Sequence, residues 1–370
     1  MVTATGTDRA RDDRSTQKQL IRARPRSLAG FGAMFTLSKF IPNEGVPSFT
    51  NEVCFHPDGK TFGASYEQKD EVRIFDAGDL SLIRVFRNPA AALNQPHGLL
   101  LTQKHVIVAN KGASPCDFRI FRLDDDSSAP SSAYTTPFPH LAEGHSMALS
   151  GRRLVVTYCE GRGKKGAIVS YDYDDDNGRI IGPTDIQERW FRRFGDAKGV
   201  AFDATGNAIY VTFQSDAVSW RRDLFERAKN AVSFGRRGRT TRNGIAMFSI
   251  DQRGRFGRRP LWRKVFSKFC RLENIHVHGG LAVVSNADDG CVQLHDLRTD
   301  RAFRRPLQVL RDRLVFPHGA KLSPDGSLLL VSDNGLEVED HHVHWSTFVS
   351  PRSDGLLLFE RQPSVAPGRP

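Results

Sequence analysis

The chain has 370 residues, with 53 Lys and Arg against 42 Asp and Glu, which gives a formal net charge of +11. Such a balance is typical of proteins that bind nucleic acids or anionic membranes. Residues 1–26 hold seven basic and three acidic side chains, and residues 219–271 hold sixteen basic and three acidic; the rest has 30 basic and 36 acidic. Because the chain outside these two segments is mildly acidic, we do not expect a protein that coats nucleic acid.

Other features narrow the class of protein further. The chain has no apolar run near the roughly 18–20 residues that a membrane span needs. Residues 1–26 show neither an apolar signal core nor an Arg-Arg pair, so we expect a cytoplasmic protein with a disordered basic arm over 1–30. The cysteines are odd in number, scattered and never spaced as CxxC, which argues against disulfides and thiolate zinc sites: Cys54, Cys116, Cys159, Cys270 and Cys291.

A hairpin pattern recurs along the chain. The segments FHPDGK (55–60) and LSPDGS (322–327) each place a Pro-Asp-Gly turn between two short apolar runs, as β-hairpins do. Weaker copies lie at 101–104, 149–152, 202–207 and 277–280. A third apolar run follows each hairpin and ends on a ring side chain: Phe75, Phe121, Tyr171, Phe248, His295 and Phe359. The pattern predicts six repeats of at least three strands.

Fourth strands complete five of these repeats, and we expect them at 82–86, 131–136, 188–194, 260–266 and 305–310. The sixth repeat ends near Phe359, but the strand-like segment 33–40 precedes the first hairpin and has no sheet of its own. Pairing the two would close a ring without free edges. We therefore predict an all-β chain with one six-bladed β-propeller over 31–361 and a tail over 362–370. Seven blades and two β-sandwich domains are the alternatives.

Aligning the six hairpins brings one polar position of each inner strand to the propeller axis: Asn51, His97, His145, Lys198, Glu273 and His318. Six polar groups at a narrow axis need a ligand, water or an ion to satisfy them. Three imidazoles and a carboxylate suit a divalent transition metal such as Zn, Fe, Cu, Ni or Mn, and suit Ca²⁺ less. We predict His97, His145, Glu273 and His318 as metal ligands; a water-filled polar channel is the alternative.

Two further residues are candidates for proton transfer. Lys198 could act as an acid or bind an anionic group of a substrate. Glu52 follows Asn51 and would replace it in the ring if the alignment is displaced by one residue. The positions that end the second strands mix aromatic and polar side chains, as ligand pockets do, although ordinary packing would also account for them: Tyr66, Asn110, Tyr158, Phe213, Asn286 and Asp333.

Two long loops, 214–243 and 334–355, join second and third strands and should overhang the ring. The first carries an Arg-rich run that could clamp a carboxylate or phosphate, or dock an acidic partner: Arg236, Arg237, Arg239 and Arg242. In the second, His342 and His344 share a face at strand spacing and could add ligands or a base, or could face solvent.

The hairpins QPHGLLLTQKHVIVANKG (95–112) and FPHGAKLSPDGSLLLVSDNG (316–335) resemble the repeats of YVTN and lactonase-type propellers. The six repeats, with Glu52 near the start of the first inner strand, are similar to the gluconolactonase, paraoxonase and strictosidine-synthase group. That resemblance implies small-molecule chemistry at the central mouth, either hydrolysis with a divalent ion or a metal-free condensation. The calcium-binding relatives use mainly carboxylate and amide oxygens, whereas this ring is rich in His.

Three functions follow from these patterns. The first is a metal-dependent hydrolase or lyase that acts on a small anionic metabolite at the ring. The second is a metal-free cyclase or isomerase that uses the same ring, and the third is a non-catalytic scaffold whose basic loop docks an acidic partner. The oligomeric state is not predicted.

Overall fold

The computed structural model describes residues 35–43, 48–159, 166–214, 243–266, 270–335, 338–339, 342–343 and 354–363. Residues 34–363 form one compact unit. The predicted arm over 1–30 and the tail beyond residue 363 lie outside the described residues. Within them, no helix is both long enough and apolar enough to cross a membrane.

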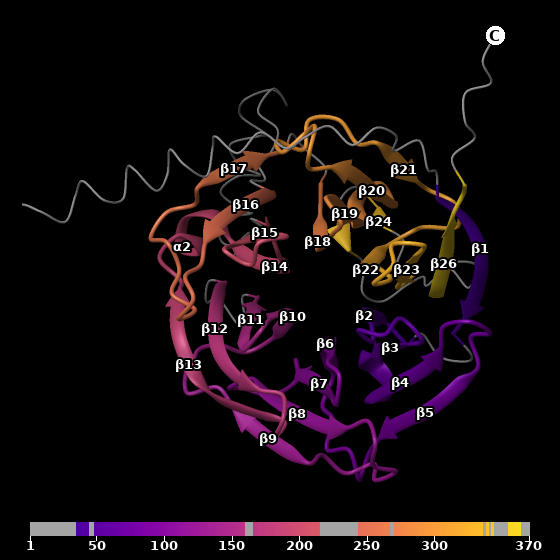
Figure 1. The fold of residues 1–370 in the computed structure, drawn as a ribbon, viewed down its shortest axis with the longest axis vertical. Helices are drawn as coiled ribbons and strands as arrows, with labels where there is room; N and C mark the ends of the chain where they lie inside the picture. The colour runs from indigo at the N-terminus through magenta and orange to yellow at the C-terminus, as the bar shows by residue number, and fades with distance from the viewer. Residues whose placement is uncertain are drawn as a thin grey trace, which may run out of the picture. The chain divides into compact units, whose positions relative to one another are not determined.

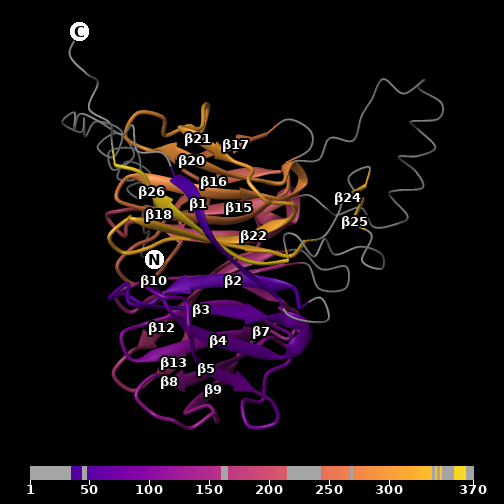
Figure 2. The ribbon, with the colours of Figure 1, turned by 90° about the vertical axis from the view of Figure 1, so that its right-hand side faces the viewer.

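The described strands form six four-stranded antiparallel sheets in a ring around a central axis (Figures 1 and 2). Blades one to three comprise, in order, β2 (Thr50–Phe55), β3 (Thr61–Tyr66), β4 (Glu71–Asp76) and β5 (Leu82–Arg87); β6 (Pro96–Leu101), β7 (His105–Asn110), β8 (Asp117–Arg122) and β9 (Ser132–Thr135); β10 (Gly144–Ser150), β11 (Arg153–Tyr158), β12 (Ala167–Asp174) and β13 (Arg179–Gln187).

Blades four to six comprise β14 (Asp196–Phe202), β15 (Ala208–Gln214), β16 (Gly244–Ser249) and β17 (Trp262–Val265); β18 (Leu272–His278), β19 (Leu281–Asn286), β20 (Cys291–Asp296) and β21 (Gln308–Leu310); β22 (Pro317–Leu322), β23 (Leu328–Asp333), β26 (Gly355–Arg361) and β1 (Phe35–Pro42). Short elements between them are η1 (Glu67–Lys69), α2 (Phe191–Phe194), η2 (Ala287–Asp289) and the paired β24 (Val338–Glu339) and β25 (His342–Val343). The predicted six-bladed propeller is confirmed.

The N-terminal strand closes the ring, as predicted. β1 pairs antiparallel with β26 from Phe35↔Arg361 to Pro42↔Gly355, so the first and last strands of the fold share one blade. The neighbouring blade holds the end of β1 in place: Gln308 Nε2 donates to the Phe35 carbonyl, and the Phe35 N–H donates to Gln308 Oε1, both at 2.8 Å. Closure leaves neither an unpartnered first blade nor an unpartnered last blade in the ring.

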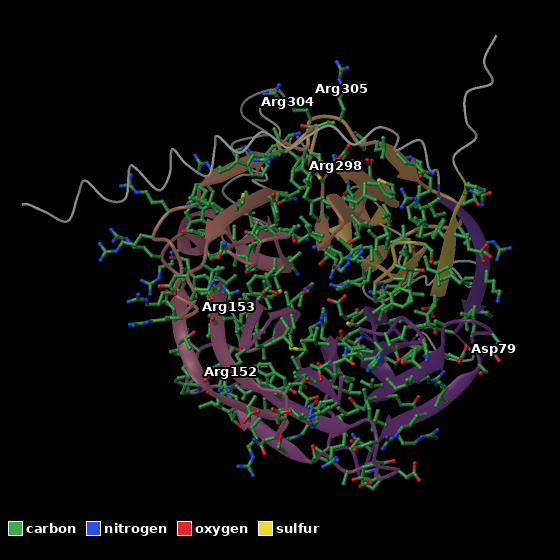
Figure 3. All side chains as sticks on the ribbon, viewed as in Figure 1. Asp79, Arg152, Arg153, Arg298, Arg304 and Arg305 are labelled. Atoms are coloured by element: carbon green, nitrogen blue, oxygen red, sulfur yellow. The ribbon has the colours of Figure 1, made fainter. Side chains whose placement is uncertain are left out.

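Apolar side chains fill the space between neighbouring blades, while the charged side chains of Arg304 and Arg305 lie on the outside of the ring (Figure 3). The ring side chains that end the third strands are buried in all six blades. In five blades they are Phe or Tyr. Blade five has His295, which packs against Phe303 with ring centroids 4.9 Å apart.

The outer strand of blade three differs from its prediction at 188–194. The structure places this strand at β13, and residues 191–194 form the short helix α2. Trp190 and Phe194 are four residues apart, which is helical spacing, and their rings stack at 4.3 Å between centroids. Trp190 also contacts Phe213 and Phe248 of blade four, so this aromatic segment fills the gap between two blades instead of extending a sheet.

The column predicted as a small-molecule pocket lies inside the blades. Its six side chains are at most 2% exposed: Tyr66, Asn110, Tyr158, Phe213, Asn286 and Asp333. The three Asn and Asp members accept hydrogen bonds from the backbone just before an inner strand. Asn110 accepts from the Asn94 N–H and Asn286 from the Arg271 N–H, both at 3.1 Å. They anchor the entry to the inner strands, and none of the six residues lines the cavity at the axis.

Neighbouring inner strands approach so closely that three of them carry glycine where their backbones meet. A Cβ atom on Gly199 would lie 2.4 Å from the Ile275 backbone nitrogen, and one on Gly319 would lie 2.8 Å from the Asn51 carbonyl oxygen. By contrast, a Cβ on Gly182 of the outer strand β13 would meet nothing within 4 Å. Glycine at the axis is therefore a packing requirement.

The first prediction uses this pair of glycines. Gly199→Ala should lower the free energy of unfolding by about 2 kcal/mol or more, because rigid backbone blocks the added methyl group. Gly182→Ala, the matched control, should change it by less than about 0.5 kcal/mol. Urea denaturation followed by circular dichroism measures both values, and equal effects at the two positions would contradict the packing described above.

The second prediction concerns Asp333, which accepts from the N–H groups of Val315, Phe316 and Gly335. Burial raises the pKa of Asp333 to about 7, so between about pH 4 and pH 7 the folded protein holds a proton that the unfolded chain has lost. This contribution to stability is full at the acidic end and is lost as the pH rises through 7. Blades two and five have Asn at the equivalent position, and Asp333→Asn should remove this pH dependence.

The measurement is urea denaturation of both proteins from pH 5 to pH 8. The difference between their free energies of unfolding should change by up to about 1.4 kcal/mol per pH unit below pH 7. Parallel pH profiles for the wild type and the variant would show that Asp333 does not titrate in this range.

Candidate metal centre

The predicted ring positions coincide with an irregularity in every inner strand. Pairing with the second strand shifts register at this point in all six blades: between Thr50 and Val53, Pro96 and Gly98, Gly144 and Met147, Ala197 and Val200, Leu272 and Asn274, and Pro317 and Ala320. A bulge of this kind re-aims side chains and leaves backbone groups without a ladder partner. These groups need other hydrogen-bond partners.

Hydroxyl groups of the second strands supply many of those partners. Ser65 Oγ donates to the His97 carbonyl at 2.8 Å, Ser285 Oγ to that of His318 at 2.6 Å, and Ser332 Oγ to that of Asn51 at 2.7 Å. Each of these bonds crosses to the next blade. The serine and threonine positions just before the end of each second strand were not among the predicted site residues, although their recurrence in five of six repeats is visible in the sequence: Ser65, Thr157, Thr212, Ser285 and Ser332.

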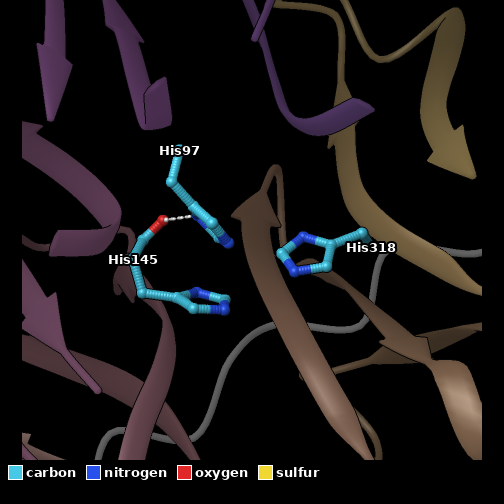
Figure 4. A group of neighbouring side chains, drawn as sticks. All are labelled: His97, His145 and His318. Atoms are coloured by element: carbon cyan, nitrogen blue, oxygen red, sulfur yellow. Dashed lines mark hydrogen bonds between the residues drawn. The ribbon is translucent and has the colours of Figure 1, made fainter. Parts of the chain in front are cut away.

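All six predicted ring residues line one cavity of about 70 Å³ at the axis: Asn51, His97, His145, Lys198, Glu273 and His318. Three of them are buried imidazoles whose candidate ligand atoms lie within 4.8 Å of one another (Figure 4). The ring centroids of His97 and His145 are 4.2 Å apart, and that of His318 is 4.9 and 5.0 Å from them.

Backbone carbonyls orient two of the imidazoles. His97 Nδ1 donates to the His145 carbonyl and His318 Nδ1 donates to the Asn51 carbonyl, both at 3.0 Å. A carbonyl only accepts, so Nδ1 carries the hydrogen and Nε2 keeps its lone pair. The same arrangement fixes metal-binding histidines in proteins. The two Nε2 atoms are therefore ready to accept a ligand.

Glu273 completes the centre. Its Oε2 atom lies 3.3 Å from His145 Nε2, 3.6 Å from His318 Nε2 and 3.7 Å from Lys198 Nζ, and its Oε1 atom lies 3.4 Å from Arg271 Nε. Burial alone would raise the pKa of Glu273, but Lys198 and the surrounding nitrogen groups outweigh it and hold the pKa well below its usual range. The carboxyl group is therefore ionised.

The imidazoles are neutral. Burial lowers the pKa of His318 to about 4, and burial with the neighbouring positive charges lowers the pKa values of His97 and His145 well below their usual range. Burial works against the charged form of Lys198, but Cys159 and the carboxylates of Glu273 and Asp196 raise its pKa above the ordinary value. At neutral pH the centre thus combines three uncharged imidazoles with a carboxylate and an ammonium group.

A second set of polar contacts forms the rim of the cavity. Asn51 Nδ2 donates to Glu67 Oε2 at 2.5 Å, and Asn334 Nδ2 donates to Asn51 Oδ1 at 3.1 Å. Lys111 Nζ lies 3.1 Å from Glu67 Oε1. Glu67, Lys111 and Arg271 line the same cavity but were not predicted, because Glu67 and Lys111 follow the ends of second strands and Arg271 precedes β18.

Glu52 is absent from this cavity and lies in the layer beneath it. Its carboxylate accepts from Asn274 Nδ2 at 2.9 and 3.1 Å and lies 3.5 Å from Lys321 Nζ. Asn51, and not Glu52, is the residue that blade one contributes to the ring. The two residues face the axis at different depths because of the bulge between Thr50 and Val53.

The loop residues predicted to bind substrate, Arg236, Arg237, Arg239, Arg242 and His344, lie outside the described residues, and for His342 only the backbone in β25 is described. Both ends of the first loop are held at the metal centre. Gln214 Nε2 donates to the Leu272 carbonyl, and Asn243 Nδ2 donates to the Cys270 carbonyl. These bonds fix the backbone that carries Arg271 and Glu273.

The donor set fits a divalent transition metal. Four ligands at about 2.1 Å from a tetrahedral ion are about 3.4 Å apart. Glu273 Oε2 lies at similar distances from two imidazole nitrogens, 3.3 Å from His145 Nε2 and 3.6 Å from His318 Nε2. Two buried atoms at this centre, His145 Nδ1 and Glu273 Oε2, have no hydrogen-bond partner among the described residues. Glu273 Oε2 has ion-pair contacts, and buried polar atoms of this kind need water, an ion or another ligand to satisfy them fully.

Comparisons with known proteins support the fold. No protein-family model and no curated protein sequence matches the chain. Among solved structures, a luciferin-regenerating enzyme is similar over 90% of this chain and 96% of its own, with 9% identity and a TM-score of 0.55. Regucalcin from Agrobacterium tumefaciens, described as a calcium-binding protein, is similar over 88% of this chain and 93% of its own, with 11% identity and a TM-score of 0.54. At such identities the likeness shows a shared propeller fold, the fold that the sequence pattern predicted.

Proposed function

We propose that the protein is a metal-dependent enzyme that acts on a small anionic metabolite at the central mouth of the propeller. The observation that carries this proposal is the buried cluster of three neutral imidazoles beside the ionised Glu273. His97, His145 and His318 would hold a divalent transition metal, with Glu273 as an additional ligand or as a base. Such an ion supplies Lewis-acid activation of a carbonyl group or of water.

The charges around the cavity favour an anion once a metal is bound. Its lining contains three acidic residues, Glu67, Glu143 and Glu273, and three basic residues, Lys111, Lys198 and Arg271. These charges balance, and the imidazoles are neutral, so a divalent ion would leave the cavity with an excess of positive charge. Lys198 is the basic residue of the predicted ring itself, and it would bind an anionic group of the substrate or donate a proton.

The ring would also serve metal-free acid–base chemistry, as in a cyclase or isomerase, because Glu273 already has ionic partners without a metal. The two proposals differ in one measurable quantity, the metal content. The scaffold function predicted from the Arg-rich loop lies outside the described residues and gains no support from them.

The third prediction concerns metal content. Full-length protein incubated with Zn²⁺, Co²⁺, Ni²⁺ or Mn²⁺ and then desalted should retain about one ion per chain by elemental analysis. His97→Ala, His145→Ala and His318→Ala should each lower the retained amount at least tenfold, because each removes a ligand.

The matched control is His295→Phe, which also removes a buried imidazole but places there the ring that four other blades have. This variant should retain the metal. Circular dichroism reports whether each variant is folded. A wild-type protein that retains no metal would contradict the proposal and favour the metal-free alternative.

The fourth prediction concerns the anionic substrate. Cobalt-loaded protein should change its visible absorption when acetate or oxalate binds at the ion. Lys198→Met should weaken that binding about ten- to hundredfold, because it removes a charge-assisted contact. Lys104→Met, which removes an exposed lysine of the outer surface paired with Asp176, is the control and should leave the affinity unchanged. Equal affinities in wild type and Lys198→Met would contradict the role of Lys198.

A further inference from the structure

The inner strands line a second cavity at the opposite end of the axis. The residue three positions after each ring residue belongs to its lining: Cys54, Leu100, Ala148, Ala201, His276 and Lys321. This lower cavity has a volume of about 560 Å³ and extends to the hairpin turns that join the first and second strands. That volume is typical of small-molecule sites. Among the described residues, none lines both cavities.

A polar layer separates the two cavities. Glu52, Ser146 and Asn274 follow the ring residues of blades one, three and five, and all are at most 1% exposed. The other three blades have glycine at this position, Gly98, Gly199 and Gly319, where the backbone of the neighbouring inner strand approaches closely. The hydrogen bonds from Asn274 to Glu52 join blades five and one across the glycine of blade six.

Lys321 brings a positive charge into this interior. Its side chain is 8% exposed, its ammonium group lies 3.5 Å from Glu52 Oε1, and it lines the lower cavity. An ammonium group has three hydrogens to donate, and among the described residues the ion pair with Glu52 engages one of them. A buried charge retains hydrogen-bonding capacity that must be satisfied by protein, water or a ligand.

Two further polar atoms at this depth, Asn274 Oδ1 and His276 Nε2, have no hydrogen-bond partner among the described residues. Burial, followed by the charge of Lys321, lowers the pKa of His276 well below its usual range, so this imidazole is neutral. Burial also raises the pKa of Glu52, so this carboxyl group takes up a proton more readily than an exposed one. Once protonated, it no longer balances the charge of Lys321. Of these residues, His276 lines the lower cavity together with Lys321, so this end of the cavity presents an unpartnered imidazole nitrogen and an ammonium group.

The walls between this polar end and the turns are apolar. They include Leu100, Met147, Ala148, Val200 and Ala201. Asp203 is the acidic residue of the lining, and it lies in the hairpin turn at residues 203–206 rather than beside Lys321. A ligand that fits this arrangement has an apolar body and one anionic end group.

We propose that the lower cavity is a second ligand site, separate from the metal centre, that binds a small monocarboxylate with an apolar chain. The carboxylate would contact the Lys321 ammonium group and the His276 ring, and the chain would lie against the apolar wall. The site is formed by the same six inner strands as the metal centre, but it does not depend on the metal or on the function proposed for it.

The probe is octanoate, titrated into the full-length protein by isothermal titration calorimetry, with octanol as the uncharged comparison. Octanoate should bind saturably with about one site per chain, and octanol should bind at least about tenfold more weakly because it lacks the charge. Ala148→Phe should abolish binding, since it fills the cavity without removing a charge. Ile181→Phe, a change of similar kind at a side chain 57% exposed on the outer strand of the same blade, should have no effect.

The charge is tested by a double variant, Glu52→Gln with Lys321→Met, which removes both members of the buried pair and leaves no unpaired charge. It should bind octanoate at least about tenfold more weakly than the wild type. His97→Ala, which removes a metal ligand, should bind octanoate as the wild type does, so the two proposals can fail separately. The inference is overturned if octanoate does not bind, if octanol binds as well, if Ala148→Phe retains binding, or if only the ring variant loses it.

Discussion

The hydrogen bonds that neighbouring blades form at the axis are the constraint on which the rest of the structure depends. Six strands converge on one axis, and each leaves regular pairing where its ring residue faces the cavity. The backbone carbonyls that lose their ladder partner there are buried, so they need other hydrogen-bond donors. Ser65, Ser285 and Ser332 reach them from the neighbouring blade. The bonds that stabilise the ring thus also determine the positions of the candidate ligands.

Two of the imidazoles take part in the same network. Blade two has Ala109 where five other blades have a hydroxyl group, and there the His97 ring itself donates to the carbonyl of the next blade. The structural bond and the presentation of Nε2 to the cavity are therefore one interaction. These two imidazoles satisfy backbone carbonyls through Nδ1 and still present Nε2 to the cavity. A ring of polar side chains is therefore compatible with a stable propeller.

Charge differs between the two ends of the axis. At the upper end, Glu273 has several cationic neighbours and the cavity lining is electrically balanced before any ion binds. At the lower end, one Glu52–Lys321 pair is enclosed by mostly apolar walls. Inner-strand positions three residues apart thus support different chemistry at the two ends of the axis. The solved propellers that share this fold do not predict that chemistry, because function depends on the residues placed at the axis.

The sequence alone was sufficient for the blade number, the closing strand and the six ring positions, because hairpin turns and alternating apolar residues repeat at regular intervals. It was insufficient at the 188–194 segment, where Trp190 and Phe194 pack between blades, and at the column containing Asp333, whose polar side chains anchor backbone inside the blades. Both depend on neighbours distant in the chain. Only the tertiary structure decided that Glu52 pairs with Lys321 beneath the ring, since that contact joins the first and the last inner strands of the chain. Repetition determines which residues reach the axis, and packing between blades determines how deep each lies and what it contacts.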